Sequence, residues 1–197
     1  MTRIILASQS PARRMLLEQL GLTFEVMPSD IDEDGHPEKS PAARAKILAR
    51  LKAEKCRREH SDAWIIACDT LVEAHDGTLL EKPLNSKDAE RMMRLQSVTC
   101  SFVHSGICLI TPSGDVYDDI QTTNVFFNML TDDDLDFWVA DDSHWKGRSG
   151  AFTISDVGQL LIERIDGDWT SVVGLPVFLL GRLFERAGTP LREFLSH

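Results

Sequence analysis

The chain has 197 residues, of which 43% are hydrophobic and 26% are charged, and its formal net charge is −10. These values are typical of a globular protein and exclude general disorder, and the length favours one domain, which we expect to span residues 1–197. The acidic balance argues against binding to nucleic acids or to anionic membranes, although a few local Arg and Lys can still bind a small anion.

The cysteines and the apolar segments indicate the compartment. None of the four cysteines forms a C-x-x-C pair, so reduced thiols are expected rather than disulfides or a zinc site. The chain opens without a signal-peptide pattern and has no apolar run long enough for a membrane span. We therefore predict a cytoplasmic protein with no membrane partner.

The first elements in chain order alternate between short strands and helices. Residues 3–7 are β-branched and apolar, which predicts a buried strand. Ser10 suits the N-cap of a helix over residues 11–20, because a proline at the first helical position follows it. A strand over residues 24–27 and an acidic turn over residues 29–35 come next.

A second helix is predicted over residues 41–58, with Ile47, Leu48 and Leu51 on its buried side. The apolar run before Asp69 predicts a central strand that ends there. Because strands and helices alternate while hairpins break a purely parallel order, we expect an α/β fold with a mixed central sheet flanked by helices. The later elements are a strand over 63–68, a hairpin over 70–80, a helix over 86–95, strands over 101–111 and 116–128, a helix starting at 131–134, a strand over 159–165 and a helix over 175–187.

The first candidate for chemistry is the segment with Ser8, Ser10, Arg13 and Arg14 at a strand–helix junction. Such a junction presents unpaired backbone N–H groups and the positive end of the helix dipole, which bind phosphate. Hydroxyl and guanidinium groups would complete the binding site, since Arg matches phosphate oxygens in bidentate fashion. The alternative is an ordinary N-cap with solvated arginines.

Two carboxylates are the candidates for a metal site. Asp69 follows an apolar strand, and ligands in open α/β sheets bind beyond the carboxyl ends of strands. Glu33 lies in an acidic loop and could act as a second metal ligand or as a general base for water. The alternatives are a simple turn at Asp69 and a solvated charge run around Glu33.

Two lysines, Lys52 and Lys82, could neutralise phosphate charge, although each alone is more often a surface residue. The histidines show no metal-ligand spacing. We expect His104, within a predicted strand, to be a structural residue with satisfied hydrogen bonds.

In order, the segments LASQSPARRMLL, DIDE, LARLKA, IIACDTLV, EKPLNSKDAERMM, SFVHSGICL, GRSGAFTI and VVGLPV resemble the Maf family of nucleoside triphosphate pyrophosphatases, also known as septum formation inhibitor Maf-like proteins. The resemblance covers nearly the whole chain. It implies a two-lobed, inosine-triphosphatase-like architecture with a nucleotide cleft. It also implies hydrolysis of a nucleoside triphosphate to the monophosphate and pyrophosphate, with Mg²⁺ or Mn²⁺ as cofactor. A homodimer is a further family expectation, and Phe126, Phe127, Phe137 and Trp138 are candidates for its interface, although aromatic residues at such positions are more often core.

The resemblance assigns roles to the candidate residues. Asp69, Glu33 and Lys82 would serve catalysis, and the two carboxylates would also hold the metal. The residues expected to bind substrate are Ser8, Ser10, Arg13, Arg14, Lys52 and Thr70.

The segments differ in the base that they indicate. Ala12 separates the proline from the two arginines, as in members that prefer 7-methyl-GTP. In contrast, the segments around Asp69 and Lys82 resemble the members that act on dTTP and UTP. Those members carry G-I-Q-G where this chain has Thr153-Ile154-Ser155-Asp156, which removes an amide that would contact the base. The resemblance favours pyrimidine nucleotides, with a modified nucleotide as the other option.

Two other functions are open to the same residues. One is a nucleotide-binding regulator of cell division with weak or no catalysis, and the other is a phosphatase that releases orthophosphate. Retention of Asp69, Glu33 and Lys82 together favours an enzyme. The products of turnover distinguish the three hypotheses.

Overall fold

The computed structural model describes residues 3–32 and 37–195 of the chain, apart from the side chain of Asp156. Backbone contacts divide the chain into two compact units, each built from segments that are not contiguous in the sequence. Unit 1 comprises Met1–Asp69, Ser105–Gln121 and Gly174–His197, and unit 2 comprises Thr70–His104 and Thr122–Val173.

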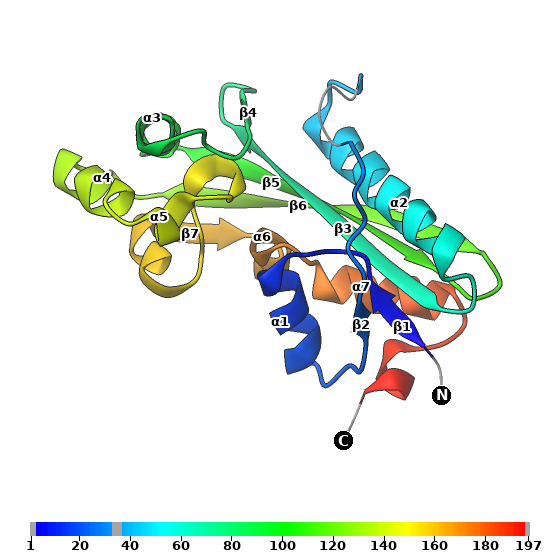
Figure 1. Ribbon diagram of the computed structural model, residues 1–197. Coiled ribbons are helices and arrows are strands. Elements are labelled where there is room, and N and C mark those ends of the chain that lie inside the picture. Colours follow the sequence, from blue (N-terminus) through cyan, green and yellow to red (C-terminus); the bar gives the residue numbers. More distant parts are fainter. Residues whose placement is uncertain (1–2, 33–36, 196–197) are drawn as a thin grey trace. The chain divides into compact units, whose positions relative to one another are not determined.

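Strands and helices alternate over most of the described chain (Figure 1). The strands are β1 (Ile4–Leu6), β2 (Glu25–Val26), β3 (Trp64–Ala74), β4 (Leu79–Leu80), β5 (Cys100–Ile110), β6 (Val116–Phe127) and β7 (Ile162–Asp166). The α-helices are α1 (Pro11–Gln19), α2 (Pro41–Glu59), α3 (Ser86–Gln96), α4 (Asp132–Val139), α5 (Asp142–Trp145), α6 (Trp169–Val173) and α7 (Val177–Arg186). The 3₁₀-helices are η1 (Ser149–Ala151), η2 (Asp156–Leu161) and η3 (Leu191–Phe194).

The strands are hydrogen-bonded in the order β2-β1-β3-β5-β6-β7, and β4 pairs with β3. Strand β1 is parallel to both β2 and β3, whereas β3–β4 and β6–β7 are antiparallel pairs. Parallel pairs require long crossover connections, and α1 accordingly lies between β1 and β2, while α1 and α2 both lie between β1 and β3. The mixed α/β fold expected from the sequence is confirmed.

In unit 1 the residues of β1 and β3 alternate between two faces of the sheet. One face, which includes Ile5 and Ile65, packs with Ala49 and Ala53 of α2 in a single buried cluster. On the other face, Trp64 stacks on Phe184 of α7 with ring centroids 5.1 Å apart. Both faces of these strands are therefore buried, which explains their continuous apolar sequence.

The buried face of α2 differs from the one predicted. Leu48 is buried as expected, but Leu51 is exposed and Ile47 is only half-buried. Helix α2 instead turns small residues toward the sheet, because it approaches β5 closely: a Cβ on Gly106 would lie 2.3 Å from the carbonyl oxygen of Ala45. The residues that α2 buries are Ala45, Leu48, Ala49, Lys52, Ala53 and Cys56.

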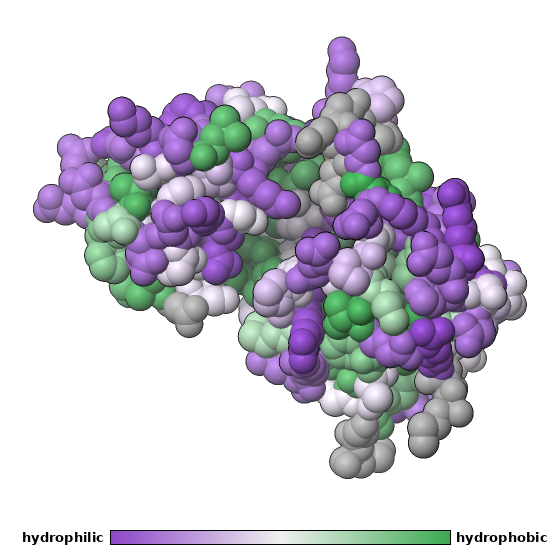
Figure 2. Space-filling view, viewed as in Figure 1, coloured by the Kyte–Doolittle hydropathy of each residue, from purple (hydrophilic) through white to green (hydrophobic). Residues whose placement is uncertain are grey.

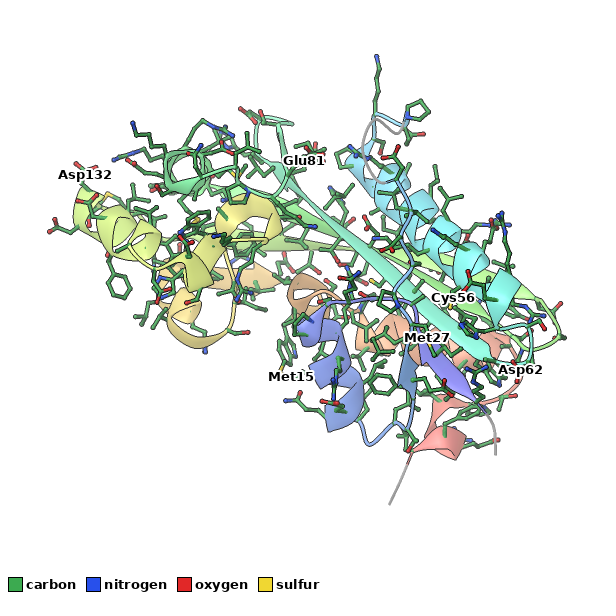
Figure 3. All side chains as sticks on the ribbon, in the orientation of Figure 1. Met15, Met27, Cys56, Asp62, Glu81 and Asp132 are labelled. Atoms are coloured by element: carbon green, nitrogen blue, oxygen red, sulfur yellow. The ribbon has the colours of Figure 1, made fainter. Side chains whose placement is uncertain are left out.

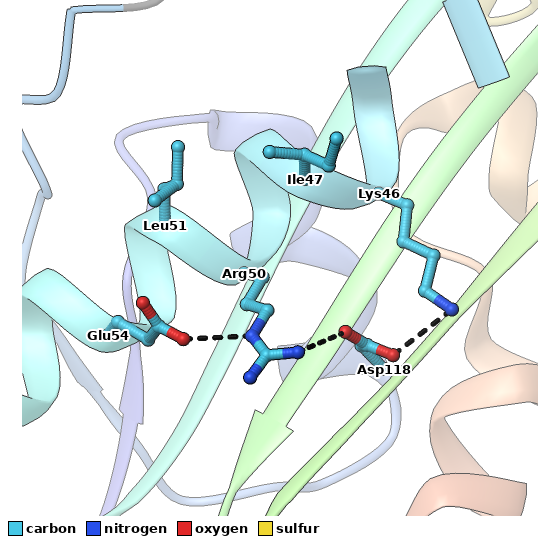
Figure 4. A pocket seen from close by; sticks show the side chains of 6 residues that line it. All are labelled: Lys46, Ile47, Arg50, Leu51, Glu54 and Asp118. Carbon is cyan, nitrogen blue, oxygen red and sulfur yellow. Dashed lines mark hydrogen bonds and ion pairs between the residues drawn. The ribbon is translucent and has the colours of Figure 1, made fainter. Parts of the chain in front are cut away.

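Ile47 and Leu51 line a pocket of about 360 Å³ on the outer side of α2 (Figure 4). The Lys46 ammonium and the Arg50 guanidinium both pair with the carboxylate of Asp118, at 3.1 and 3.5 Å, and Arg50 also pairs with Glu54. Two carboxylates thus balance the two cations, so this pocket is a poor candidate for a polyphosphate.

Unit 2 has its own core, formed mainly by α3, α4 and the strands that they cover. Trp138 is fully buried there, and its indole N–H donates to the carbonyl of Ala151. Phe127 packs against Phe152 in the same core, whereas Phe137 is exposed. Two of the aromatic residues considered for a dimer interface, Phe127 and Trp138, are thus core residues.

Two predicted strand boundaries are wrong. Strand β3 does not end at Asp69 but continues to Ala74, where the predicted hairpin turn follows. Strand β7 begins at Ile162 rather than at residue 159, because the residues before it form the 3₁₀-helix η2. No helix within residues 3–32 and 37–195 is both long and apolar enough to cross a membrane.

Candidate active site

The junction between β1 and α1 has the form that the sequence predicts. Ser10 caps α1, and its Oγ accepts a hydrogen bond from the backbone N–H of Arg13 at 3.4 Å. Ser8 is buried, and its Oγ accepts from the backbone N–H of Ser10 at 3.2 Å. The two hydroxyls thus fold the chain between strand and helix into a tight turn.

Arg13 is held within unit 1 by two hydrogen bonds from its guanidinium. Its Nη1 donates to Ser8 Oγ at 3.0 Å, and its Nε donates to the carbonyl of Gly174 at 2.8 Å. Arg14 behaves differently, because its side chain is exposed and pairs with Glu18 one helical turn later. The structure thus joins Ser8, Ser10 and Arg13 and directs Arg14 to the surface.

Lys52 and Asp69 form a buried ion pair in unit 1. The Lys52 Nζ lies 2.5 Å from Asp69 Oδ1, and the two residues are only 7% and 4% exposed. Lys52 reaches Asp69 from the buried face of α2, while Asp69 lies on the face of β3 that also carries Ile65 and Ala67. Both charges are therefore removed from water, and each compensates the other.

Asp69 and the β1–α1 junction lie on neighbouring parallel strands. Leu6 of β1 pairs with Ile66 of β3, and the backbone N–H of Ala7 donates to the Ile66 carbonyl. Ser8 is two residues beyond Leu6, and Asp69 is three residues beyond Ile66. Ser8 and Asp69 thus both follow the paired part of β1 and β3, at the C-terminal end of β1, although β3 itself continues past Asp69.

Asp69 has one carboxylate oxygen to offer to a metal ion. Its Oδ2 is buried and accepts no hydrogen bond from the residues that the structure describes, whereas Oδ1 is taken by Lys52. Within the same residues, no group of three His, Cys, Asp or Glu side chains is placed to hold a metal ion. A single carboxylate oxygen fits a Mg²⁺ site of the kind that takes its remaining ligands from water and substrate phosphates.

The other predicted site residues are distributed differently. Thr70 and Lys82 belong to unit 2, where Thr70 is half-buried on β3 and Lys82 is exposed after β4. Glu33, the second predicted metal ligand, lies outside the described residues.

His104 is a structural residue, as expected. Its Nδ1 lies 2.9 Å from Thr122 Oγ1, and its Nε2 lies 3.0 Å from Glu73 Oε2. The ring is buried in unit 2 and links β5 to β6 and β3. Both ring nitrogens are engaged, as a buried imidazole requires.

Comparison with known proteins identifies the family. The model of the family described as Maf-like protein matches residues 3–187 and so includes segments of both units. This chain belongs to the Maf-like protein family.

Curated relatives of this Maf-like protein match it over nearly its full length. The dTTP/UTP pyrophosphatase of Deinococcus radiodurans is 41% identical, over 94% of this chain and 93% of the relative. That of Treponema denticola is 36% identical over 90% and 93%, and that of Caldicellulosiruptor bescii is 35% identical over 98% of both chains.

Solved structures show a more distant likeness. The Ham1 protein of Staphylococcus aureus matches 64% of this chain and 72% of its own, at 14% identity and a TM-score of 0.48. A dITP/XTP pyrophosphatase from Mycobacterium abscessus matches 64% and 74%, at 15% identity and a TM-score of 0.42.

One residue that contacts the candidate site had no role in the sequence interpretation of this Maf-like protein. Gly174 lies in the V-V-G-L-P segment, and its carbonyl accepts the hydrogen bond from Arg13 Nε. It is buried and has a φ of +126°, a region that favours glycine. A glycine two residues before a proline is a visible signal of such a backbone, but its partner is 161 residues away and cannot be read from the sequence.

Proposed function

We propose that this Maf-like protein hydrolyses nucleoside triphosphates to the monophosphate and pyrophosphate, and that dTTP and UTP are its substrates. The observation that carries this proposal is the buried Asp69–Lys52 pair, in which Asp69 Oδ2 has no hydrogen-bond partner among the described residues, on the strand next to the one that leads into the junction built from Ser8, Ser10 and Arg13. The full-length relatives, which are named dTTP/UTP pyrophosphatases, support the reaction and the pyrimidine base.

The junction residues supply the groups that bind a polyphosphate. The Ser8 and Ser10 hydroxyls and the Arg13 guanidinium donate hydrogen bonds that match phosphate oxygens. By the family resemblance, Arg14 is a further candidate for substrate binding and Lys82 for catalysis, and both are exposed. Thr70 follows Asp69 in the chain and is a candidate hydroxyl donor to the substrate.

Asp69 is the proposed metal ligand, through Oδ2, with Glu33 as the second carboxylate. Lys52 holds Oδ1 and so fixes the direction in which Oδ2 points. A bound Mg²⁺ or Mn²⁺ would draw negative charge from the phosphate oxygens at the reacting centre. Asp69 is also our candidate for orienting the attacking water, and Glu33 for accepting its proton.

The base preference rests on the relatives more than on the site. Ala12 departs from the pattern expected for dTTP and UTP, and the segment that ends at Asp156 lacks the expected glutamine. We infer that other side chains contact the pyrimidine in this chain. A cytoplasmic location, a homodimer and a single domain over residues 1–197 stay predictions.

Turnover by the purified protein tests the proposal. With Mg²⁺ or Mn²⁺, we expect pyrophosphate and monophosphate from dTTP and UTP, and slower release from purine triphosphates and 7-methyl-GTP. Asp69→Asn should lower kcat by about 100-fold or more, as expected for loss of a group that acts on the reacting atoms.

Asp62→Asn is the matched control, because it makes the same chemical change at an exposed aspartate of unit 1. The Asp62 carboxylate pairs with Arg3 at 3.3 Å. The variant should retain wild-type turnover. Release of orthophosphate would instead indicate the phosphatase. Nucleotide binding with no turnover above that of Asp69→Asn would indicate the nucleotide-binding regulator.

A further inference from the structure

A mainly apolar groove of about 350 Å³ lies in unit 2, and none of the residues of the proposed chemistry lines it. It is bounded by the end of β6, by α4 and by η2. In Figure 2, hydrophobic residues reach the surface next to the hydrophilic surface of α4. The residues that line the groove are Asn128, Met129, Leu130, Asp134, Phe137, Val157, Leu160 and Leu161.

Large apolar side chains in the groove are exposed to water. Met129 is 73% exposed, Leu160 is 74% and Phe137 is 56%. Scattered apolar residues on a surface need no explanation, but a contiguous group of them is typical of an interaction site. These three side chains line one groove. A molecule that covered them would remove their apolar surface from water, which is thermodynamically favourable.

The backbone beneath the groove is held firmly. The N–H of Asn128 donates to the carbonyl of Leu161 at 3.0 Å, and a capping box between Thr131 and Asp134 fixes the start of α4. Leu135 of α4 belongs to the buried core directly below. A groove already ordered in this way loses little conformational entropy on binding.

The charge around the groove determines which partner fits it. Residues 128–142 contain six aspartates and no lysine or arginine. Asp132, at the start of α4 (Figure 3), is paired with Arg94 at 2.8 Å, whereas Asp133 and Asp136 are exposed on the same helix. Asp134 is the one charged residue that lines the groove, and Asp133 and Asp136 are its near neighbours on α4. The groove is therefore mainly apolar, and the charges that the α4 side contributes are negative.

We propose that this groove binds a segment of another protein that presents two or three large apolar side chains flanked by Lys or Arg. The apolar side chains would cover Met129, Phe137 and Leu160, and the cations would pair with the aspartates of α4. A second copy of the chain fits less well, because a symmetric contact would place two acidic α4 helices together, in a protein of net charge −10.

A designed peptide pair tests this inference with the full chain. The probes are a fluorescently labelled amphipathic peptide of Leu and Lys and a matched peptide in which every Lys is Glu. We expect the Lys peptide to bind at least about tenfold more tightly, and its affinity to fall with added salt.

Variants locate the binding surface. Leu160→Ser and Phe137→Ser should each weaken binding of the Lys peptide by about tenfold, the loss typical of a central interface residue. Joint replacement of Asp133 and Asp136 by Asn should weaken it and flatten its salt dependence. Phe178→Ser is the matched control, because Phe178 is 76% exposed on α7 in unit 1. Far-ultraviolet circular dichroism verifies that each variant is folded.

Three results would overturn the inference. The first is an equal loss of binding in Phe178→Ser, and the second is equal affinity for the two peptides. The third is a dimer in sedimentation equilibrium that Leu160→Ser converts to a monomer, because the groove would then be an interface between two copies of this chain.

Discussion

At the scale of single residues, the buried ion pair between Lys52 and Asp69 has a large effect on stability. Removal of one partner of a buried pair leaves an uncompensated charge away from water, at a cost of about 3–5 kcal/mol. We expect Lys52→Met to lower the free energy of unfolding by about that amount, measured by urea denaturation.

Lys46→Met is the control for this prediction. Lys46 lies on the same helix and pairs with Asp118 at 3.1 Å, but its side chain is 39% exposed. An exposed pair contributes only about 0–1 kcal/mol, so this variant should unfold nearly as the wild type does. Equal losses in the two variants would show that burial does not set the energy of the Lys52–Asp69 pair.

Gly174 is the second residue with a testable role. Its positive φ strains any other residue by about 1–2 kcal/mol, and its carbonyl accepts the hydrogen bond from Arg13. Gly174→Ala should therefore lower both stability and kcat/KM. Gly188→Ala separates the two effects, because Gly188 has a φ of +79° and follows α7. It should lose stability but keep its kcat/KM, and a fall in activity equal to that of Gly174→Ala would contradict the positioning of Arg13.

At the scale of helices and strands, the N-terminal cap of α4 should make the stability of the protein depend on pH. Hydrogen bonds from the Thr131 hydroxyl and backbone N–H lower the pKa of Asp134 below its ordinary value. A carboxyl with a lowered pKa in the folded state stabilises the protein above its unfolded pKa, and this stabilisation is lost as the pH falls through the folded value.

Asp134→Ala should therefore lower Tm at pH 6, and its difference from the wild type should narrow below about pH 4. Asp133→Ala removes the same charge from the same helical turn and leaves the capping hydrogen bonds intact. Its Tm should change less at pH 6. A difference between Asp134→Ala and the wild type that stays constant down to pH 3 would contradict the capping role.

The elements that the sequence predicted best are those with a local signal. Ser10 caps α1 as expected, and α2 and α4 begin where predicted, with Ser40 and Thr131 as their N-caps, because capping depends on residues within one turn. The predicted end of β3 was wrong because the pair Asp69-Thr70 is typical of a polar turn. In the structure the strand continues through Asp69, whose charge is compensated by Lys52. That compensation depends on a contact between distant segments, which no local pattern contains.

The candidate site shows the same limit. The β1–α1 junction could be predicted because its residues are adjacent in the sequence. The buried face of α2 could not, since Gly106 of β5 decides which side of the helix approaches the sheet. The buried position of Lys52 follows from that choice. Lys52 was assigned to the site by the family resemblance, because the apolar periodicity of the helix did not predict that it is buried.

At the scale of the whole molecule, substrate binding should stabilise the folded protein. A ligand at 100 times its Kd contributes about 2.7 kcal/mol, which for a chain of this size raises Tm by about 5–10 °C. We expect this shift with Mg²⁺ and a non-hydrolysable α,β-imido analogue of dTTP, measured by differential scanning calorimetry. Asp69→Asn should show a smaller shift. An equal shift with and without Mg²⁺ would argue against a metal ligand at Asp69.

The interleaving of the two units has a consequence for biosynthesis. Unit 1 includes the segment from Gly174 onward, and β3 passes from one unit to the other without a break between Asp69 and Thr70. During synthesis, Arg13 cannot bond to the Gly174 carbonyl, nor Trp64 stack on Phe184, until the C-terminal segment has left the ribosome. Unit 1 therefore cannot fold completely before synthesis is nearly finished. Nascent chains halted near residue 150 should remain sensitive to protease over their first 69 residues, and neither unit can be expressed as one uninterrupted fragment.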